Sequence, residues 1–218
     1  IVSHCATSLD GGNAYNLIGG TAYRSGMWAS SIRHYNGTFY VAVNPSFANG
    51  RIYYATNAAG PWQFYQLNQG IYDPGLFIDT DGTGYVVYGH GPQSIATLNS
   101  NYSQVVAVSN NVVDSGGEGS HLVKRGSYYY LFNANPGVWP FQLRCSRATS
   151  IFGPWETGRI CLTATTGGHQ GAIVDLDDSG TNWFGFVHQD SGAIGRMPRI
   201  GPVFWENDWP VFGTPSAR

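Results

Sequence analysis

Four residues whose side chains could take part in catalysis or ligand binding recur along the chain at nearly regular intervals. They are Trp28, Asp73, Glu118 and His169, at spacings of 45, 45 and 51 residues. Two carboxylates that flank a glycosidic bond can divide the acid–base work, one protonated to donate to the leaving oxygen and the other ionised. Asp73 and Glu118 are the candidate pair. Glu118 is one of three glutamates and stands in Gly-Gly-Glu-Gly, where small neighbours are expected to give a substrate close access to its carboxylate.

Each of these residues also has an ordinary structural explanation. Asp73 precedes proline and glycine, so it could merely cap a turn. Glu118 could be a solvated loop acid, and His169 could be a hydrogen-bonded core residue. Trp28 could be a platform for sugar stacking or a core side chain. The residue types alone leave both explanations open, so the elements that position these residues must be considered.

A repeated pattern of elements runs through the sequence. Four segments each contain an extended run, a turn with glycine and a second run rich in aromatic or β-branched residues. Their turn glycines are Gly37, Gly82, Gly126 and Gly180, spaced by 45, 44 and 54 residues. This period is typical of the four-stranded blades of an all-β propeller. A β-sandwich, the alternative architecture, has no reason to repeat at this interval.

The propeller pattern brings the four candidate residues together. The first strand of each blade lines the central channel, so residues ahead of those strands converge at one mouth of the axis. The candidates stand directly ahead of the expected inner strands. We therefore expect an aromatic ring, two carboxylates and an imidazole in one pocket. A second repeat, RIYYATNAAGPW and RCSRATSIFGPW, predicts a third strand that leads to a Gly-Pro turn.

Composition excludes several classes of partner. Charged residues make up 11% and aromatic residues 15% of the chain, with 30 glycines, which favours short strands and tight turns over surface helices. The net charge is −2 and Lys124 is the single lysine, so no basic stripe is available for nucleic acid. No apolar run reaches membrane-spanning length. Neither nucleic acid nor a membrane is an expected partner, and the sequons at Asn36 and Asn101 fit a secreted, extracellular protein.

The three cysteines allow one intramolecular disulfide. Cys145 and Cys161 lie on either side of a predicted turn, SRATSIFGPWETG, where two strands could bring them together. The alternative is that all three cysteines are buried thiols that act as small hydrophobic residues.

Six motifs, in this order, resemble glycoside hydrolase family 43. They are GMWASSIR from Gly26, YDPGLFIDTDG from Tyr72, EGSHLVK from Glu118, GHQGAIVD from Gly168, the pair Gly195-Arg196 and WENDWPV from Trp205. The resemblance covers nearly the whole chain. It implies one catalytic domain, a five-bladed β-propeller with an incomplete first blade, that cuts sugars from plant cell-wall polysaccharides. The remainder of blade one is expected at 1–22, and the other blades at 23–70, 71–115, 116–166 and 167–218.

The resemblance also implies roles for the candidate residues. The family works by inversion, with a glutamate as general acid, one aspartate as general base and a second aspartate that tunes and orients the acid. Glu118 corresponds to the acid and Asp73 to the tuning aspartate, whose negative charge would keep the acid protonated. Arg196 would contact sugar hydroxyls, and His169 would hold a channel metal, usually calcium. The expected substrates are xylan, arabinoxylan or arabinan, with release of xylose or arabinose.

One departure from the family pattern concerns the general base. The family's base aspartate lies ahead of the inner strand of blade one, whereas this sequence opens at Ile1-Val-Ser-His-Cys, which looks like a later strand of that blade. We expect the base to lie in a segment ahead of residue 1, or a second chain to complete the blade.

Two other functions remain open on the sequence. The run SLDGGNAY from Ser8 resembles the Asp-box turn of sialidase propellers, but the eleven basic residues show no arrangement suited to a substrate carboxylate. A non-catalytic sugar-binding propeller is the second alternative, because channel aromatics and Arg196 could hold a glycan without cutting it. Hydrolysis of synthetic aryl xylosides and arabinofuranosides separates an enzyme from such a binding protein.

Overall fold

The computed structural model describes residues 27–45, 48–135, 142–163, 170–190 and 196–213. In these ranges the backbone forms strands, turns and irregular segments without a helix, as the composition predicts. The described residues accordingly contain no helix that could cross a membrane. The chain divides into two compact units. The first runs up to Gly89 and includes Ile95–Ser109, and the second contains His90–Ser94 and the residues from Asn110 onward.

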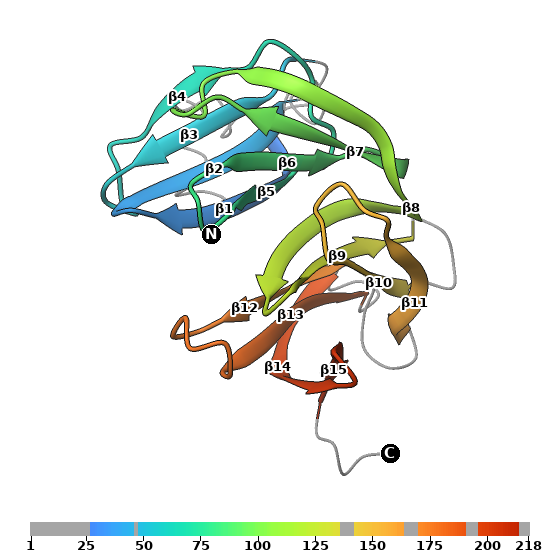
Figure 1. Cartoon of the computed structure of the whole chain (residues 1–218). Coiled ribbons are helices and arrows are strands. Elements are labelled where there is room, and N and C mark those ends of the chain that lie inside the picture. The colour runs from blue at the N-terminus through green and yellow to red at the C-terminus, as the bar shows by residue number, and fades with distance from the viewer. Residues whose placement is uncertain (1–26, 46–47, 136–141, 164–169, 191–195, 214–218) are drawn as a thin grey trace. The chain divides into compact units, whose positions relative to one another are not determined.

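The first unit opens with a four-stranded antiparallel sheet in the order β1-β2-β3-β4 (Figure 1). Its strands are β1 (Met27–Tyr35), β2 (Thr38–Pro45), β3 (Arg51–Ala55) and β4 (Gln63–Gln66). An antiparallel hairpin follows, formed by β5 (Gly75–Ile78) and β6 (Gly84–Tyr88). Ile52, Ile71, Leu76 and Val86 belong to one buried cluster, so both sets of strands share a core.

Two strands contribute to both units. They are β7 (Gly91–Leu98) and β8 (Val105–Arg125). The order β5-β6-β7-β8 continues through β8 into β8-β9-β10-β11. One strand of 21 residues therefore ends one four-stranded set and begins the next, across the boundary expected between residues 115 and 116.

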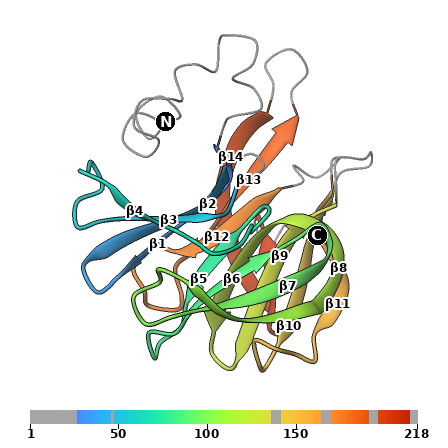
Figure 2. The same ribbon diagram turned by 90° about the horizontal axis from the view of Figure 1, so that it is seen from above.

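The second unit contains the remaining strands. They are β9 (Tyr128–Ala134), β10 (Gln142–Ala148), β11 (Glu156–Thr163), β12 (Gly171–Asp175), β13 (Trp183–Asp190), β14 (Arg196–Glu206) and β15 (Trp209–Phe212). Strands β12 to β15 form a four-stranded sheet in chain order, in which β12, β13 and β14 are adjacent (Figure 2). Phe132 of β9, Leu143 of β10, Ile173 of β12 and Trp183 of β13 lie in one buried cluster.

The predicted repeat is present as recurring hairpin geometry. Gly37 joins β1 to β2, Gly82 joins β5 to β6, Gly126 joins β8 to β9 and Gly180 joins β12 to β13. Their φ angles are +74°, +85°, +57° and +77°, a region that glycine enters without the steric penalty of a side chain. The four turn signals read from the sequence are therefore confirmed.

The second predicted repeat is confirmed by two matching turns. Gly60 follows β3 and Gly153 follows β10, with φ angles of +89° and +87°. A Cβ atom on either glycine would lie 3.0 Å from Cδ1 of the tryptophan two residues later, Trp62 or Trp155. In both sheets an indole ring folds back over the Gly-Pro turn, which explains the shared Gly-Pro-Trp sequence.

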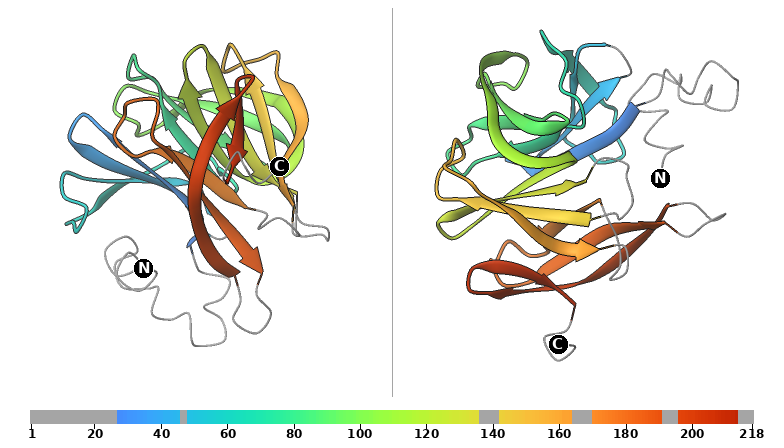
Figure 3. Two further views of the ribbon diagram at one scale, coloured as in Figure 1. Left: turned by 90° about the horizontal axis from the view of Figure 1, so that it is seen from below. Right: turned by 90° about the vertical axis from the view of Figure 1, so that its right-hand side faces the viewer.

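A tight hairpin joins β14 to β15, the red strands in Figure 3, and β15 contacts β11. Its turn residues Asn207 and Asp208 have φ angles of +50° and +57°, as expected for a two-residue turn with these residue types. Arg147 Nη1 donates to their carbonyl oxygens at 2.9 and 3.0 Å, and the Tyr130 hydroxyl donates to the Asp208 carbonyl at 2.9 Å. Burial, with a further contribution from the Asp208 carboxylate, raises the pKa of Tyr130 to about 12, so this hydroxyl stays protonated and able to donate well into the alkaline range.

A disulfide joins Cys145 of β10 to Cys161 of β11, with their Cα atoms 5.9 Å apart. The pairing read from the turn between them is confirmed, and the alternative of three free thiols is wrong. Neither cysteine is directly opposite the other, because the β10–β11 register shifts twice along the pair. The bond ties a strand of the buried core to an edge strand of the same sheet.

Removing this disulfide should weaken the second unit. We expect a Cys145→Ala/Cys161→Ala double variant to lose about 3 kcal/mol of unfolding free energy, because a closed loop of this length restricts the unfolded chain. Urea denaturation measures the loss. A reducing agent should lower the midpoint of the wild type and leave that of the double variant unchanged, and an unaltered wild-type midpoint would contradict the prediction.

Candidate active site

Glu118 lies on β8 at a break in strand pairing. It pairs with Ala134 of β9, whereas His121 pairs with Phe132, so β8 has one more residue than β9 between these pairs. Bulges of this kind bend a strand and redirect its side chains. The residue after Glu118 is Gly119, with φ +66°, and the Glu118 side chain keeps 23% of its surface exposed. The carboxylate is thus held on a defined backbone feature and remains accessible.

The same irregularity recurs at Trp28. Trp28 pairs with Asn44, but Ser31 pairs with Ala42, and the intervening Ala29 has φ +44°. The sequence predicted Trp28 and Glu118 directly ahead of the inner strands. Both instead lie inside strands, β1 and β8, because each strand continues to pair with its neighbour on the N-terminal side of the bulge. The two repeats therefore place an aromatic residue and a carboxylate at corresponding backbone positions.

The glycines ahead of Glu118 are required by packing. A Cβ atom on Gly117 would lie 2.6 Å from the Ala134 carbonyl oxygen and 2.6 Å from Asn133 Cβ, so any side chain there would displace β9. Gly116 has φ +62°, and a Cβ on it would meet Arg144 Nη1 at 2.6 Å. The sequence analysis explained these glycines by close substrate access. The structure adds a second reason, which is the lack of room for a side chain at these positions.

Arg144 of β10 holds the backbone that leads to Glu118. Its Nη1 donates to the carbonyl oxygens of Ser115 and Gly116, at 2.9 and 3.3 Å. Hydrogen bonds from a charged donor are stronger than those between neutral groups. The guanidinium therefore stabilises the part of β8 where glycine replaces the usual side chains.

His90 is a neighbour of Glu118 that the sequence analysis missed. Its Nε2 lies 3.7 Å from Glu118 Oε2, and its side chain is 60% exposed. It stands between Gly89 and Gly91, whose φ angles are +134° and +87°, in the turn from β6 to β7. The sequence did contain a signal for this residue. It is a histidine flanked by two glycines, directly after the second strand of a repeat.

Asp73 lies in the first unit, directly ahead of β5 as predicted. Its φ of +49° is unusual for a residue before proline, which favours extended backbone. Non-glycine residues in this region cost about 1–3 kcal/mol and concentrate at functional sites. The preceding Tyr72 carbonyl accepts a hydrogen bond from Gly89 N at 2.9 Å, which anchors the turn that carries Asp73.

Strands that carry or follow candidate residues are neighbours within each unit. In the first unit Leu76 N of β5 donates to the buried Ser31 Oγ of β1 at 3.0 Å, which places β5 beside β1. In the second unit His121 Nε2 of β8 lies 2.8 Å from the Ile173 carbonyl of β12. Asp73 and Glu118 belong to different units, so their pairing stays a prediction.

Two candidates lie at the limits of the described residues. His169 falls outside them, and the next residue, Gln170, places its side chain where a Cβ on Gly119 would be. The backbone of Arg196 begins β14 and pairs with Asp190. Across the described ranges, no group of three or more His, Cys, Asp or Glu side chains gathers as a metal site. The roles inferred for His169 and Arg196 stay predictions.

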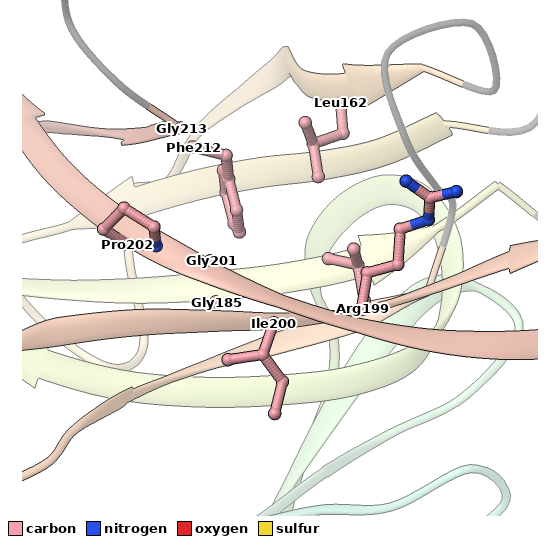
Figure 4. A pocket seen from close by; sticks show the side chains of 9 residues that line it. Leu162, Gly185, Arg199, Ile200, Gly201, Pro202, Phe212 and Gly213 are labelled. Carbon is pink, nitrogen blue, oxygen red and sulfur yellow. The ribbon is translucent and has the colours of Figure 1, made fainter.

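A separate cavity of about 330 Å³ lies in the second unit (Figure 4). It is lined by strands β11, β13, β14 and β15, with Leu162, Val187 and Phe212 supplying apolar surface and Arg199 a guanidinium. None of the described residues that line it carries a carboxylate. Acid–base cleavage that needs two carboxylates therefore does not fit this cavity.

Comparisons with known proteins agree with the motifs of the sequence. The chain is 34% identical over 202 residues to a Xylanibacter ruminicola protein that carries a β-xylosidase name, with 88% of this chain and 38% of that protein covered. It is 28% identical over 234 residues to a xylosidase/arabinosidase of Butyrivibrio fibrisolvens, with 88% and 44% covered. The chain thus spans about two fifths of the length of the curated relatives it matches.

Solved structures and a family model lead to the same assignment. A bifunctional GH43-CE protein of Bacteroides eggerthii superimposes with a TM-score of 0.76 at 31% identity, covering 87% of this chain and 26% of that one. This likeness confirms the predicted all-β propeller fold class. The expected remainder of blade one, residues 1–22, lies outside the described residues. The model of glycosyl hydrolases family 43 matches residues 10–210, and the chain therefore belongs to that family.

Proposed function

We propose that this chain is the catalytic propeller of an inverting glycoside hydrolase that releases xylose or arabinose from xylan, arabinoxylan or arabinan. The observation that carries the proposal is Glu118, a partly exposed carboxylate on a glycine-flanked bulge in a chain of this family. The pentose substrates are supported by the xylosidase and arabinosidase names of its relatives. The proposal assigns the general base to no residue of this chain.

In this mechanism Glu118 donates its proton to the oxygen of the departing sugar. Transfer of that proton as the bond breaks avoids expulsion of a strongly basic alkoxide, which is why a positioned acid accelerates the reaction. Asp73 would supply a second carboxylate that tunes and orients the acid, as the resemblance to the family implies. Trp28 would stack on a sugar face, and Arg196 would donate to sugar hydroxyls.

Secretion and a calcium ion are further parts of the proposal. The Cys145–Cys161 disulfide supports an oxidising, extracellular location. The sequon residues Asn36 and Asn101 are both exposed, as glycosylation requires. Calcium near His169 is supported by the resemblance to the family alone.

The test is hydrolysis of aryl β-xylosides and aryl α-L-arabinofuranosides by the purified full-length protein, together with whatever segment or chain supplies the expected general base. We expect release of the aryl group with one or both substrates, and production of pentose from xylan or arabinan oligosaccharides. A chelator should reduce the rate and added calcium should restore it. Sugar binding measured by calorimetry without any turnover would instead favour a carbohydrate-binding propeller.

A further inference from the structure

Gln93 of β7 is a buried amide that bonds to β8 on both sides of Glu118, to a backbone carbonyl before it and to a serine hydroxyl after it. It has 0% of its surface exposed. Its Nε2 donates to the Gly117 carbonyl at 2.7 Å and to the Gly91 carbonyl at 2.9 Å. Its Oε1 accepts from Ser120 Oγ at 2.7 Å. One side chain therefore fixes the residue before the carboxylate and the second residue after it.

Asn133 of β9 completes the arrangement. It is also 0% exposed, and its Nδ2 donates to Ser120 Oγ at 2.9 Å while its Oδ1 accepts from Ser115 Oγ at 2.9 Å. Ser115 and Ser120 are buried and enclose the segment that carries Glu118. The amides of Gln93 and Asn133 both have hydrogen-bond partners for their nitrogen and oxygen atoms. Buried polar networks that are satisfied in this way make the backbone segment they bond to more rigid.

The position of this network explains why side chains are needed there. The ladder between β8 and β9 is interrupted between Glu118 and His121, so regular backbone pairing cannot fix the bulge. Gln93 also follows closely after His90, whose ring lies 3.7 Å from the Glu118 carboxylate. Gln93 of β7 thus contacts the backbone of Gly117, and His90 just ahead of β7 lies beside the Glu118 carboxylate.

We propose that Gln93, acting with Ser120 and Asn133, is a positioning residue that holds the Glu118 carboxylate in line with the departing oxygen. The inference rests on the proposed acid role of Glu118. An acid displaced by about 1 Å can cost on the order of 100-fold in rate, so a rigid mount for the bulge has a direct catalytic consequence. The network acts through Glu118 and does not itself contact the substrate.

The experiment compares leaving groups in the Gln93→Met variant, which keeps the length of the side chain and removes its amide. Phenyl β-xyloside, or the matching arabinofuranoside if the wild type prefers it, needs the acid, whereas the dinitrophenyl glycoside departs without it. We expect kcat for the phenyl substrate to fall about 10- to 100-fold and kcat for the dinitrophenyl substrate to fall less than about 3-fold. Equal losses on both substrates, or no loss on either, would overturn the inference.

Two further variants keep the test decisive. Ser120→Ala removes the shared hydroxyl and should show the same dependence on the leaving group, so it carries the test if Gln93→Met fails to fold. Asn68→Leu is a control in the first unit, where the more exposed Asn68 amide bonds both N and O of Val105, at 3.0 and 3.1 Å. It should lower stability without changing the ratio of the two kcat values. If the full-length wild type, with the expected general base present, cleaves neither substrate, the proposed function and this inference fall together. An active wild type with an unaltered Gln93→Met ratio sinks the inference alone.

Discussion

Replacing Glu118 with glutamine should abolish turnover of glycosides that have poor leaving groups. Glutamine keeps the shape of the side chain and loses the proton that the acid donates, so kcat on a natural oligosaccharide should fall by about 1,000-fold. Substrate binding and the unfolding midpoint should stay close to those of the wild type, because the side chain is partly exposed and sits beside the exposed His90. Steady-state kinetics, with calorimetric binding as a second measurement, checks both expectations.

The chain offers a matched control for this substitution. Glu156 on β11 is 59% exposed and pairs with Arg147 at 2.9 Å, so Glu156→Gln removes a carboxylate without touching the proposed site. Its activity should equal that of the wild type. A Glu118→Gln variant that kept near wild-type activity on a natural glycan would show that another residue is the acid.

Replacing Arg147 with alanine should destabilise the second unit. Arg147 has 16% of its side chain exposed, donates to two turn carbonyls and lies over the rings of Trp209 and Tyr128, at 4.2 and 5.0 Å. Its removal leaves the Asn207 carbonyl without this donor and the Asp208 carbonyl with the Tyr130 hydroxyl alone. We expect the free energy of unfolding to fall by about 2 kcal/mol.

Arg159 provides the comparison for this prediction. Its guanidinium also lies over the Trp209 ring, at 4.9 Å, but the residue is exposed. Arg159→Ala should therefore cost less than about 1 kcal/mol. Arg147→Lys should be nearly as harmful as alanine, because a single ammonium cannot reproduce the planar, multiply bonded guanidinium. Equal unfolding midpoints for the two alanine variants in urea would contradict the account of the β14–β15 hairpin.

Local signals made much of the fold predictable. Gly37, Gly82, Gly126 and Gly180 mark turns that each need a positive φ, and such a requirement is set by a few consecutive residues. The disulfide was predictable for a similar reason, since Cys145 and Cys161 flank one recognisable turn. The order and period of these signals were sufficient for the propeller class.

The candidate site was predictable only in part. Glu118 and Asp73 could be selected because their spacing follows the repeat, and Asp73 does lie directly ahead of β5. The bulge that carries Glu118 was missed, because a register shift depends on the pairing of β8 with β9 rather than on either sequence alone. His90 was missed for the same reason: its contact with Glu118 crosses from one four-stranded set to the next.

The sequence by itself determined the repeat, the turns, the disulfide and the identity of the carboxylates that could do chemistry. Only the tertiary structure decided which polar side chains hold the segment around Glu118 and the β14–β15 turn in place. Gln93 reaches Gly117 across 24 residues of sequence and Ser120 across 27, and Arg147 reaches the β14–β15 turn across 60. A local pattern reports backbone geometry within a few residues. The choice of a hydrogen-bond partner at these separations is instead fixed by strand register and by the cost of leaving a buried polar group unpaired.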